Sequence, residues 1–177
     1  MVVESLKKVA CLVALFIPIV LQTSCSCSEE EKVERPRPTK ADFIHHNRGL
    51  MWRDSLCIVK YSDSLGLVSK PTETYLWMTV RDEGEGKQIE RGDRVTYSYV
   101  VQDLLGDTLY EAKKDGLRTI NVGKAEDCVG IDEAMLKLRR GADATVILIP
   151  SKAFGVKGDG KNVIGRVILR YDIKVIE

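Results

Sequence analysis

The sequence lacks several features that would place the protein in a common functional class. No apolar run is long enough to span a membrane: the longest, residues 9–21, has 13 residues and as a helix reaches about 20 Å, against roughly 30 Å of bilayer core. Charge of one sign is not in excess, because 27 basic residues face 26 acidic ones, and we therefore expect no nucleic-acid partner. At 177 residues the chain is too short for two full domains, but its apolar content suffices for one packed core.

Cysteine and histidine are too few for a disulfide framework or an evident metal site. Beyond residue 24 the sequence has four cysteines: Cys25, Cys27, Cys57 and Cys128. We interpret Cys57 and Cys128 first as small buried apolar residues, with a bridge between them as the less favoured alternative. The adjacent His45 and His46 point about 100° apart on a helix and do not readily share a metal ion. We expect no metal and no cofactor.

The first 24 residues have the layout of a secretory signal peptide, with Lys7 and Lys8 before the apolar run. The small residues before Cys25 resemble the lipobox of bacterial lipoproteins, in which the cysteine becomes the acylated N-terminus. Gln22 stands where that pattern prefers Leu, so Cys27 is a second candidate, and ordinary cleavage near Ser24 is the alternative to lipidation. The resemblance implies a palmitate-type anchor in a bacterial outer membrane, on the periplasmic face or the surface.

Residues 25–40 are expected to form a flexible tether between this anchor and the folded part. They consist almost entirely of Ser, Glu, Lys, Arg and Pro, a composition that buries little apolar surface. The acidic run that begins at Ser28 resembles the export signal of surface-exposed lipoproteins. A solvated acidic spacer is an equally acceptable interpretation.

The folded part is predicted to begin with a helical preface, residues 41–73, followed by a β domain, residues 74–177. The preface combines scattered apolar residues with charges and predicts a helix from Ala41 to about Ser64. Alternating apolar and β-branched residues predict the strands of the domain. These strands cover residues 74–80, 94–102, 108–111, 117–122, 144–149 and 166–176.

A single short helix is predicted between the last strands. Ile131, Ala134, Met135 and Leu138 recur at the spacing of one helix face, and Gly141 is expected to be the C′ residue that ends this helix. One helix among five or six strands predicts an α+β fold, with an antiparallel sheet wrapped against the helix.

The order of these segments resembles the FKBP-type peptidyl-prolyl isomerases from about Gly84 to Glu177. The matching stretches are Gly92-Asp93, Gly106 to Glu111, Val122-Gly123-Lys124, Val129-Gly130, Leu138 to Gly141, Ile149 to Gly155 and Leu169 to Ile173. Within that family the whole arrangement looks most like the lipoproteins associated with gliding motility. The Gly-rich stretch 155–162 corresponds to a flexible flap before the last strand.

The resemblance implies which residues form the pocket. The catalytic positions carried over are Tyr99, Glu111, Phe154 and Tyr171. The substrate-binding positions carried over are Tyr110, Glu126, Cys128, Ile131 and Val163. We expect the rings of Tyr99, Phe154 and Tyr171 to converge on a dry cleft beneath the curved sheet; core packing alone is the other interpretation of these rings.

Several positions depart from the family pattern. Ile131 stands where classical members place a Trp, Asp127 where a Val is usual, and Phe154 in place of a Tyr whose hydroxyl donates to the substrate. Arg118 and Asn162 fall near other apolar wall positions. A smaller and wetter pocket would stabilise the twisted imide less well.

The sequence therefore predicts a monomeric peptidyl-prolyl cis-trans isomerase that acts on Xaa-Pro bonds of envelope or exported proteins. It would work by stabilising a twisted imide without covalent chemistry. The alternative is a weak or inactive FKBP-fold lipoprotein that serves as a chaperone or a partner-binding component of an envelope machine.

Overall fold

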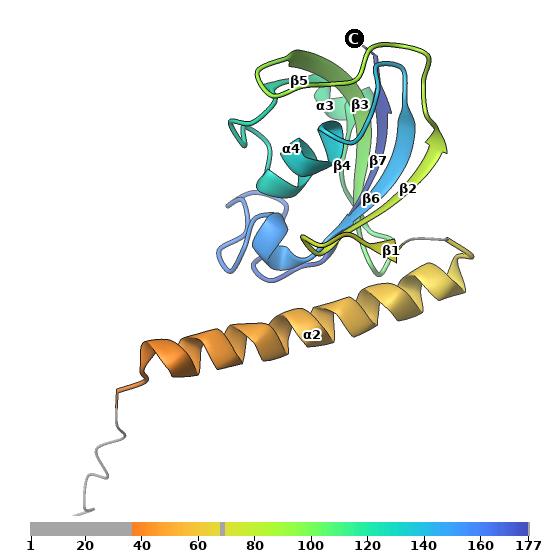
Figure 1. Cartoon of the computed structure of the whole chain (residues 1–177). Coiled ribbons are helices and arrows are strands. Elements are labelled where there is room, and N and C mark those ends of the chain that lie inside the picture. Colours follow the sequence, from red (N-terminus) through yellow and green to blue (C-terminus); the bar gives the residue numbers. More distant parts are fainter. Residues whose placement is uncertain (1–36, 68–69, 177) are drawn as a thin grey trace, which may run out of the picture. The chain divides into compact units, whose positions relative to one another are not determined.

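A long helix and a curved sheet are the main elements of the part of the chain that the structure describes (Figure 1). The structure is a computed structural model that describes residues 37–67 and 70–176. The predicted signal peptide, the lipidation site at Cys25 or Cys27 and most of the tether lie outside these residues. No helix within them is long and apolar enough to cross a membrane.

The first helix, α2, spans Lys40–Ser64, as the sequence indicates. A capping box begins it: the Thr39 hydroxyl accepts from the Asp42 amide, and the Asp42 carboxylate accepts from the Thr39 amide at 2.8 Å. Only part of its apolar surface is buried, because Ile58 is fully covered while Phe43, Trp52 and Leu56 are exposed. Cys57 is exposed and unbridged, which corrects the expectation that it is a buried residue.

Seven strands form one antiparallel sheet in the order β1-β2-β6-β7-β3-β4, with β5 also paired to β3. Their bounds are β1 Lys70–Pro71, β2 Leu76–Asp82, β3 Arg94–Asp103, β4 Thr108–Glu111, β5 Arg118–Asn121, β6 Asp143–Leu148 and β7 Leu169–Val175. The α+β class and the FKBP-like curved sheet are confirmed. The last strand begins three residues later than expected.

Both faces of β6 are buried, which explains its continuous apolar run, whereas β3 and β7 alternate between buried and less buried side chains. Side chains of β6 alternate between two clusters: Val146 and Leu148 join the main core with the short helix, while Ile147 faces Ile58 of α2. Trp77 of β2 joins Ile147 in the second cluster. The long helix therefore covers the face of the sheet opposite the main core.

The short helix α4 spans Val129–Met135 and ends earlier than its apolar spacing predicts. Leu138 still reaches the core, at the end of a turn in which its amide donates to the Met135 carbonyl at 3.0 Å. Gly141 has a positive φ of 86°, but it serves the turn into β6 and is not the C′ residue of α4. The apolar spacing continues past the end of the helix because Leu138, in the following turn, also packs in the core.

Two shorter elements complete the fold. The helix α3 covers Ala112–Asp115 after β4, and the 3-10 helix η1 covers Pro150–Lys152 after β6. The segment between η1 and β7, together with the link from β5 to α4, forms the rim of the site described next.

Candidate functional site

A hollow of about 370 Å³ opens where β4, β5 and two loops meet. Tyr110 from β4 and Phe154 from the turn after η1 supply its aromatic surface. Strand β5 and the link to α4 supply most of its polar surface. The complete lining is Tyr110, Arg118, Thr119, Ile120, Glu126, Asp127, Phe154, Asp159 and Lys161.

Arg118 and Asp127 form an ion pair in the wall of the hollow. Nη1 of Arg118 donates to Oδ2 of Asp127 at 2.7 Å, and the hydroxyl of Tyr97 donates to the same oxygen at 2.6 Å. The Asp127 side chain is 4% exposed and the Arg118 side chain 25%. Two positions expected near apolar walls thus carry a largely buried pair of opposite charges, so the cleft is not the dry one that the sequence predicts.

The environment of this ion pair determines the protonation states of Arg118 and Tyr97. Burial alone would lower the pKa of Arg118, but the charge and hydrogen bond of Asp127 outweigh burial and raise that pKa above its ordinary value. Burial, and then the negative charge of Asp127, raise the pKa of Tyr97 far above its ordinary value. Arg118 therefore remains a cation and Tyr97 a neutral donor throughout the physiological pH range.

Arg118 also covers the ring of Tyr99. Its guanidinium carbon lies 4.2 Å from the centroid of the Tyr99 ring and 5.2 Å from that of Tyr110, close enough for cation–π attraction. Tyr99 is buried and does not line the hollow. The Tyr99 ring packs against the Arg118 guanidinium.

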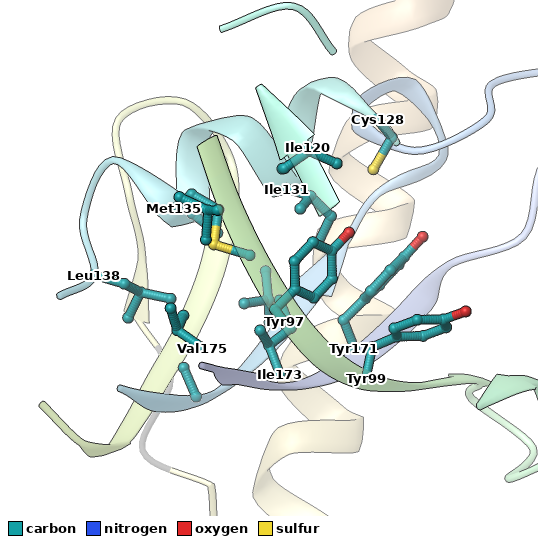
Figure 2. Close-up of a cluster of buried hydrophobic side chains, with 14 of the residues drawn as sticks. Tyr97, Tyr99, Ile120, Cys128, Ile131, Met135, Leu138, Tyr171, Ile173 and Val175 are labelled. Carbon is teal, nitrogen blue, oxygen red and sulfur yellow. The ribbon is translucent and has the colours of Figure 1, made fainter. Parts of the chain in front are cut away.

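Tyr171 lies deeper, in the core beneath the site. Figure 2 shows its ring, from β7, beside the rings of Tyr97 and Tyr99, from β3. Its buried hydroxyl has no strong hydrogen-bond partner among the described residues, and the thiol of Cys128, a weak partner, lies near it. Burial raises the pKa of that thiol to about 12, so Cys128 is an uncharged core residue.

The loop after Phe154 is held against β4. The Asp159 carboxylate accepts from the Tyr110 hydroxyl and from the amides of Lys161 and Val163, the two amides both at 2.9 Å. Asn162 Nδ2 donates to the Leu109 carbonyl at 2.9 Å. The stretch expected to be a flexible flap is therefore tied to β4 through two residues, Asp159 and Asn162.

The structure brings some of the sequence-predicted site residues to the hollow and leaves others beneath it. Those that line the hollow are Tyr110, Glu126 and Phe154. Those that lie buried in the core are Tyr99, Cys128, Ile131, Val163 and Tyr171. Glu111 ends β4 outside the lining, with its amide donating to Asp115 at 3.0 Å. Their catalytic and substrate-binding roles remain predictions.

Sequence reasoning missed the partnership of Arg118, Asp127 and Tyr97. It identified Arg118 and Asp127 separately, as departures from an apolar wall. The available signal was that the two departures carry opposite charges, a pattern that favours pairing when both fall inside a pocket. Tyr97 gave no such signal, because its place in an alternating strand predicts only a core residue.

Glu126 has a structural task at the rim. Its carboxylate accepts from the amide of Asn121 at 3.0 Å and from the side-chain Nδ2 of Asn121 at 2.8 Å. These hydrogen bonds lower the pKa of Glu126 below its ordinary value. Glu126 therefore fixes the link between β5 and α4, on which Asp127 lies.

A second hollow, of about 330 Å³, lies between α2 and the segment that follows β6. Leu50, Met51 and Val156 are among its lining residues, and the Asp54–Arg166 ion pair, at 2.9 Å, borders it. It is more apolar than the first hollow but contains none of the predicted site residues. Within the described residues, no three His, Cys, Asp or Glu side chains form a cluster that could hold a metal ion.

The first hollow offers aromatic surface and two cations, Arg118 and Lys161, of which Arg118 is the less exposed. Phe154 and Tyr110 present apolar ring area to an entering group, and Arg118 presents hydrogen-bond donors beside them. Such a site binds a small apolar ring next to a peptide carbonyl without forming a covalent bond. A proline within an extended peptide has this chemistry.

Comparison with solved structures shows the same fold. AtFKBP13 aligns with a TM-score of 0.59 at 21% identity, over 62% of this chain and 97% of its own. A peptidyl-prolyl cis-trans isomerase from Pseudomonas syringae aligns with a TM-score of 0.60 at 17% identity, over 73% and 93%. FkpA from Escherichia coli aligns with a TM-score of 0.61 at 14% identity, over 80% and 73%.

The comparison of sequences gives the family. A search of curated proteins found no match, but the profile of the FKBP-type peptidyl-prolyl cis-trans isomerase family matches residues 85–176. This match covers more than half of the chain and includes every residue that lines the first hollow. The chain belongs to the FKBP-type peptidyl-prolyl cis-trans isomerase family.

Proposed function

We propose that the protein isomerises Xaa-Pro peptide bonds in the hollow between Tyr110 and Phe154. The observation that carries this proposal is the position of the hollow: its lining lies inside the family-matched segment and includes the aromatic side chains of Tyr110 and Phe154. The reaction needs no bond cleavage, since only rotation about the imide C–N bond is required. Its substrates are polypeptides that contain proline.

The energetic requirement is modest for a site of this kind. Rotation about a peptide bond has a barrier of about 18–20 kcal/mol, and a million-fold acceleration lowers it by about 8 kcal/mol. A partly apolar wall solvates the charge-separated planar imide poorly, so it favours the twisted form relative to water. Phe154 and Tyr110 supply the aromatic part of this wall.

NMR exchange spectroscopy on a short Xaa-Pro peptide tests the proposal with the full chain. We expect the protein to increase the cis-to-trans rate at substoichiometric concentration, and Phe154→Ala to reduce kcat/KM at least about tenfold through the loss of one aromatic wall. Phe43→Ala is the matched control, because Phe43 is exposed on α2. Peptide binding without acceleration would contradict the proposal and favour a partner-binding role, which the family match does not favour.

We further propose that the protein is a lipid-anchored envelope protein, similar to the FKBP-type lipoproteins of gliding motility. The support comes from the sequence alone: a short apolar run, small residues, and then Cys25. Its substrates would then be exported or envelope polypeptides.

Metabolic labelling with a palmitate analogue tests the anchor. We expect the wild-type chain and Cys27→Ala to incorporate the label, and Cys25→Ala to lose it and leave the membrane fraction. Labelling that persists in Cys25→Ala and is lost in Cys27→Ala would move the anchor to Cys27. Absence of label in the wild type would exclude lipidation.

A further inference from the structure

Arg118 holds hydrogen-bond donors that no group in the described protein uses. A guanidinium has five N–H donors, and its bond to Asp127, at 2.7 Å, occupies one of them. No other hydrogen bond joins the Arg118 side chain to a described residue. Because this side chain lines the hollow and is 25% exposed, its remaining donors are open to a group that enters there.

The hydroxyl donors among the side chains that line the hollow are already paired, which leaves its two cations, Arg118 and Lys161. The Tyr110 hydroxyl donates to Asp159, and the Thr119 hydroxyl pairs with that of Thr96 at 3.0 Å. Phe154 brings no hydroxyl at all, and Lys161 is exposed on the outer loop. A substrate held between Tyr110 and Phe154 would therefore find its donor in Arg118.

We propose that Arg118 is a catalytic residue, which donates a hydrogen bond to the nitrogen of the prolyl imide as the bond twists. This inference rests on the proposed function. In the planar imide the nitrogen lone pair is delocalised into the carbonyl, and the nitrogen carries partial positive charge, which a cation disfavours. In the twisted imide the lone pair is localised on nitrogen, and a guanidinium N–H stabilises it.

The effect of Arg118 is therefore stronger in the transition state than in either planar isomer, which is the condition for raising kcat. The interaction leaves all covalent bonds in place: the guanidinium keeps its protons and the imide regains planarity as the other isomer.

Asp127 and Tyr97 act as positioning residues for this guanidinium. Asp127 holds Nη1, Tyr97 fixes the same carboxylate oxygen at 2.6 Å, and the Tyr99 ring supports the guanidinium at 4.2 Å. A guanidinium held by the Asp127 carboxylate and by the Tyr99 ring loses little freedom when substrate binds. The ion pair between Arg118 and Asp127 thus positions the group that donates to the substrate.

The test must avoid leaving Asp127 buried and unpaired, since a lone buried charge destabilises a fold strongly. The double variant Arg118→Met with Asp127→Leu removes both charges and restores apolar walls. The single variant Arg118→Lys keeps the charge next to Asp127 but loses the planar donor set. Arg53→Met, on the exposed surface of α2, is the matched control.

NMR exchange spectroscopy over a range of peptide concentrations separates kcat from KM in the full chain. We expect the double variant to lose at least about tenfold in kcat, Arg118→Lys to lose less, and Arg53→Met to match the wild type. Near-UV circular dichroism verifies that the variants are folded. If the double variant keeps kcat within about twofold of an active wild type, or changes KM alone, the role of Arg118 is overturned while the proposed function stands. An inactive wild type overturns both.

Discussion

At the scale of single residues, the main feature of the site is the Arg118–Asp127 ion pair, which occupies positions expected near apolar walls. Arg118 and Asp127 lie nine positions apart in sequence, and their side chains meet because β5 and the start of α4 border the same hollow. Burying such a pair has a desolvation cost that its attraction and hydrogen bonds must offset. Tyr97 supplies one of those bonds from the core side.

Removing the Tyr97 hydroxyl should destabilise the fold measurably. Tyr97→Phe deletes the 2.6 Å hydrogen bond to the Asp127 carboxylate without changing the ring, and a bond to a charged group contributes about 1.5–3 kcal/mol. Urea unfolding should show a loss of that order. Tyr75→Phe, at an exposed ring, should leave the free energy of unfolding unchanged. Equal stability of the two variants would mean that Tyr97 does not support the pair.

At the scale of elements, the long helix is held to the sheet through few side chains. Ile58 contacts Trp77, Ile147 and Ile149 on the face of the sheet opposite the main core. Polar contacts surround this cluster, including the Asp54–Arg166 ion pair at 2.9 Å. Most other apolar side chains of the helix remain exposed, which explains why its sequence shows no regular apolar period.

Ile58→Ala should therefore be far more damaging than the same truncation elsewhere on α2. A fully buried isoleucine leaves a cavity, with an expected cost of about 2–4 kcal/mol, whereas Ile44, which is exposed, should cost less than about 0.5 kcal/mol when changed to Ala. Thermal or urea unfolding measures both. Similar losses in the two variants would show that the helix does not depend on this cluster.

The loop that bears Asp159 should loosen on acidification. Burial raises the pKa of Asp159, but hydrogen bonds from Tyr110 and from the Lys161 and Val163 amides outweigh it and leave the pKa below its ordinary value. A carboxylate with a lowered folded-state pKa stabilises at neutral pH, and this contribution is lost as pH falls through that pKa.

Amide hydrogen exchange of the residue 159–163 loop checks the expectation. Protection of the Val163 amide should decrease on acidification, after correction for the intrinsic rate, and Asp159→Asn should show low protection at every pH. A pH-independent protection of Val163 in the wild type would contradict this role. Asp107→Asn, on the exposed β3–β4 turn, is a suitable control.

At the scale of the whole molecule, the sequence predicted the strands better than the site. Alternation in β3 and the β-branched residues of β6 specify buried strands, so their places follow from local pattern. The end of α4 could not be predicted from local pattern, because Leu138 fits the helical spacing although it lies in the turn after the helix. Whether Tyr99 is open or covered depends on where the long Arg118 side chain is anchored, and Asp127 sets that position from another segment.

The fold of the family explains the position of the core tyrosines but not whether the hollow is catalytic. An FKBP-type sheet places Tyr99 and Tyr171 beneath the site whether or not the hollow is catalytic. Under the proposed function, the chemistry depends instead on Tyr110, Phe154 and Arg118, which line the hollow itself. The central claim is therefore that proline binds between these three side chains.

Intermolecular nuclear Overhauser effects between an Xaa-Pro peptide and the isotopically labelled full chain test this claim most directly. We expect contacts from the proline ring protons to the side chains of Phe154 and Tyr110. Contacts to Leu50, Met51 and Val156 in the second hollow, with none at Phe154, would contradict it.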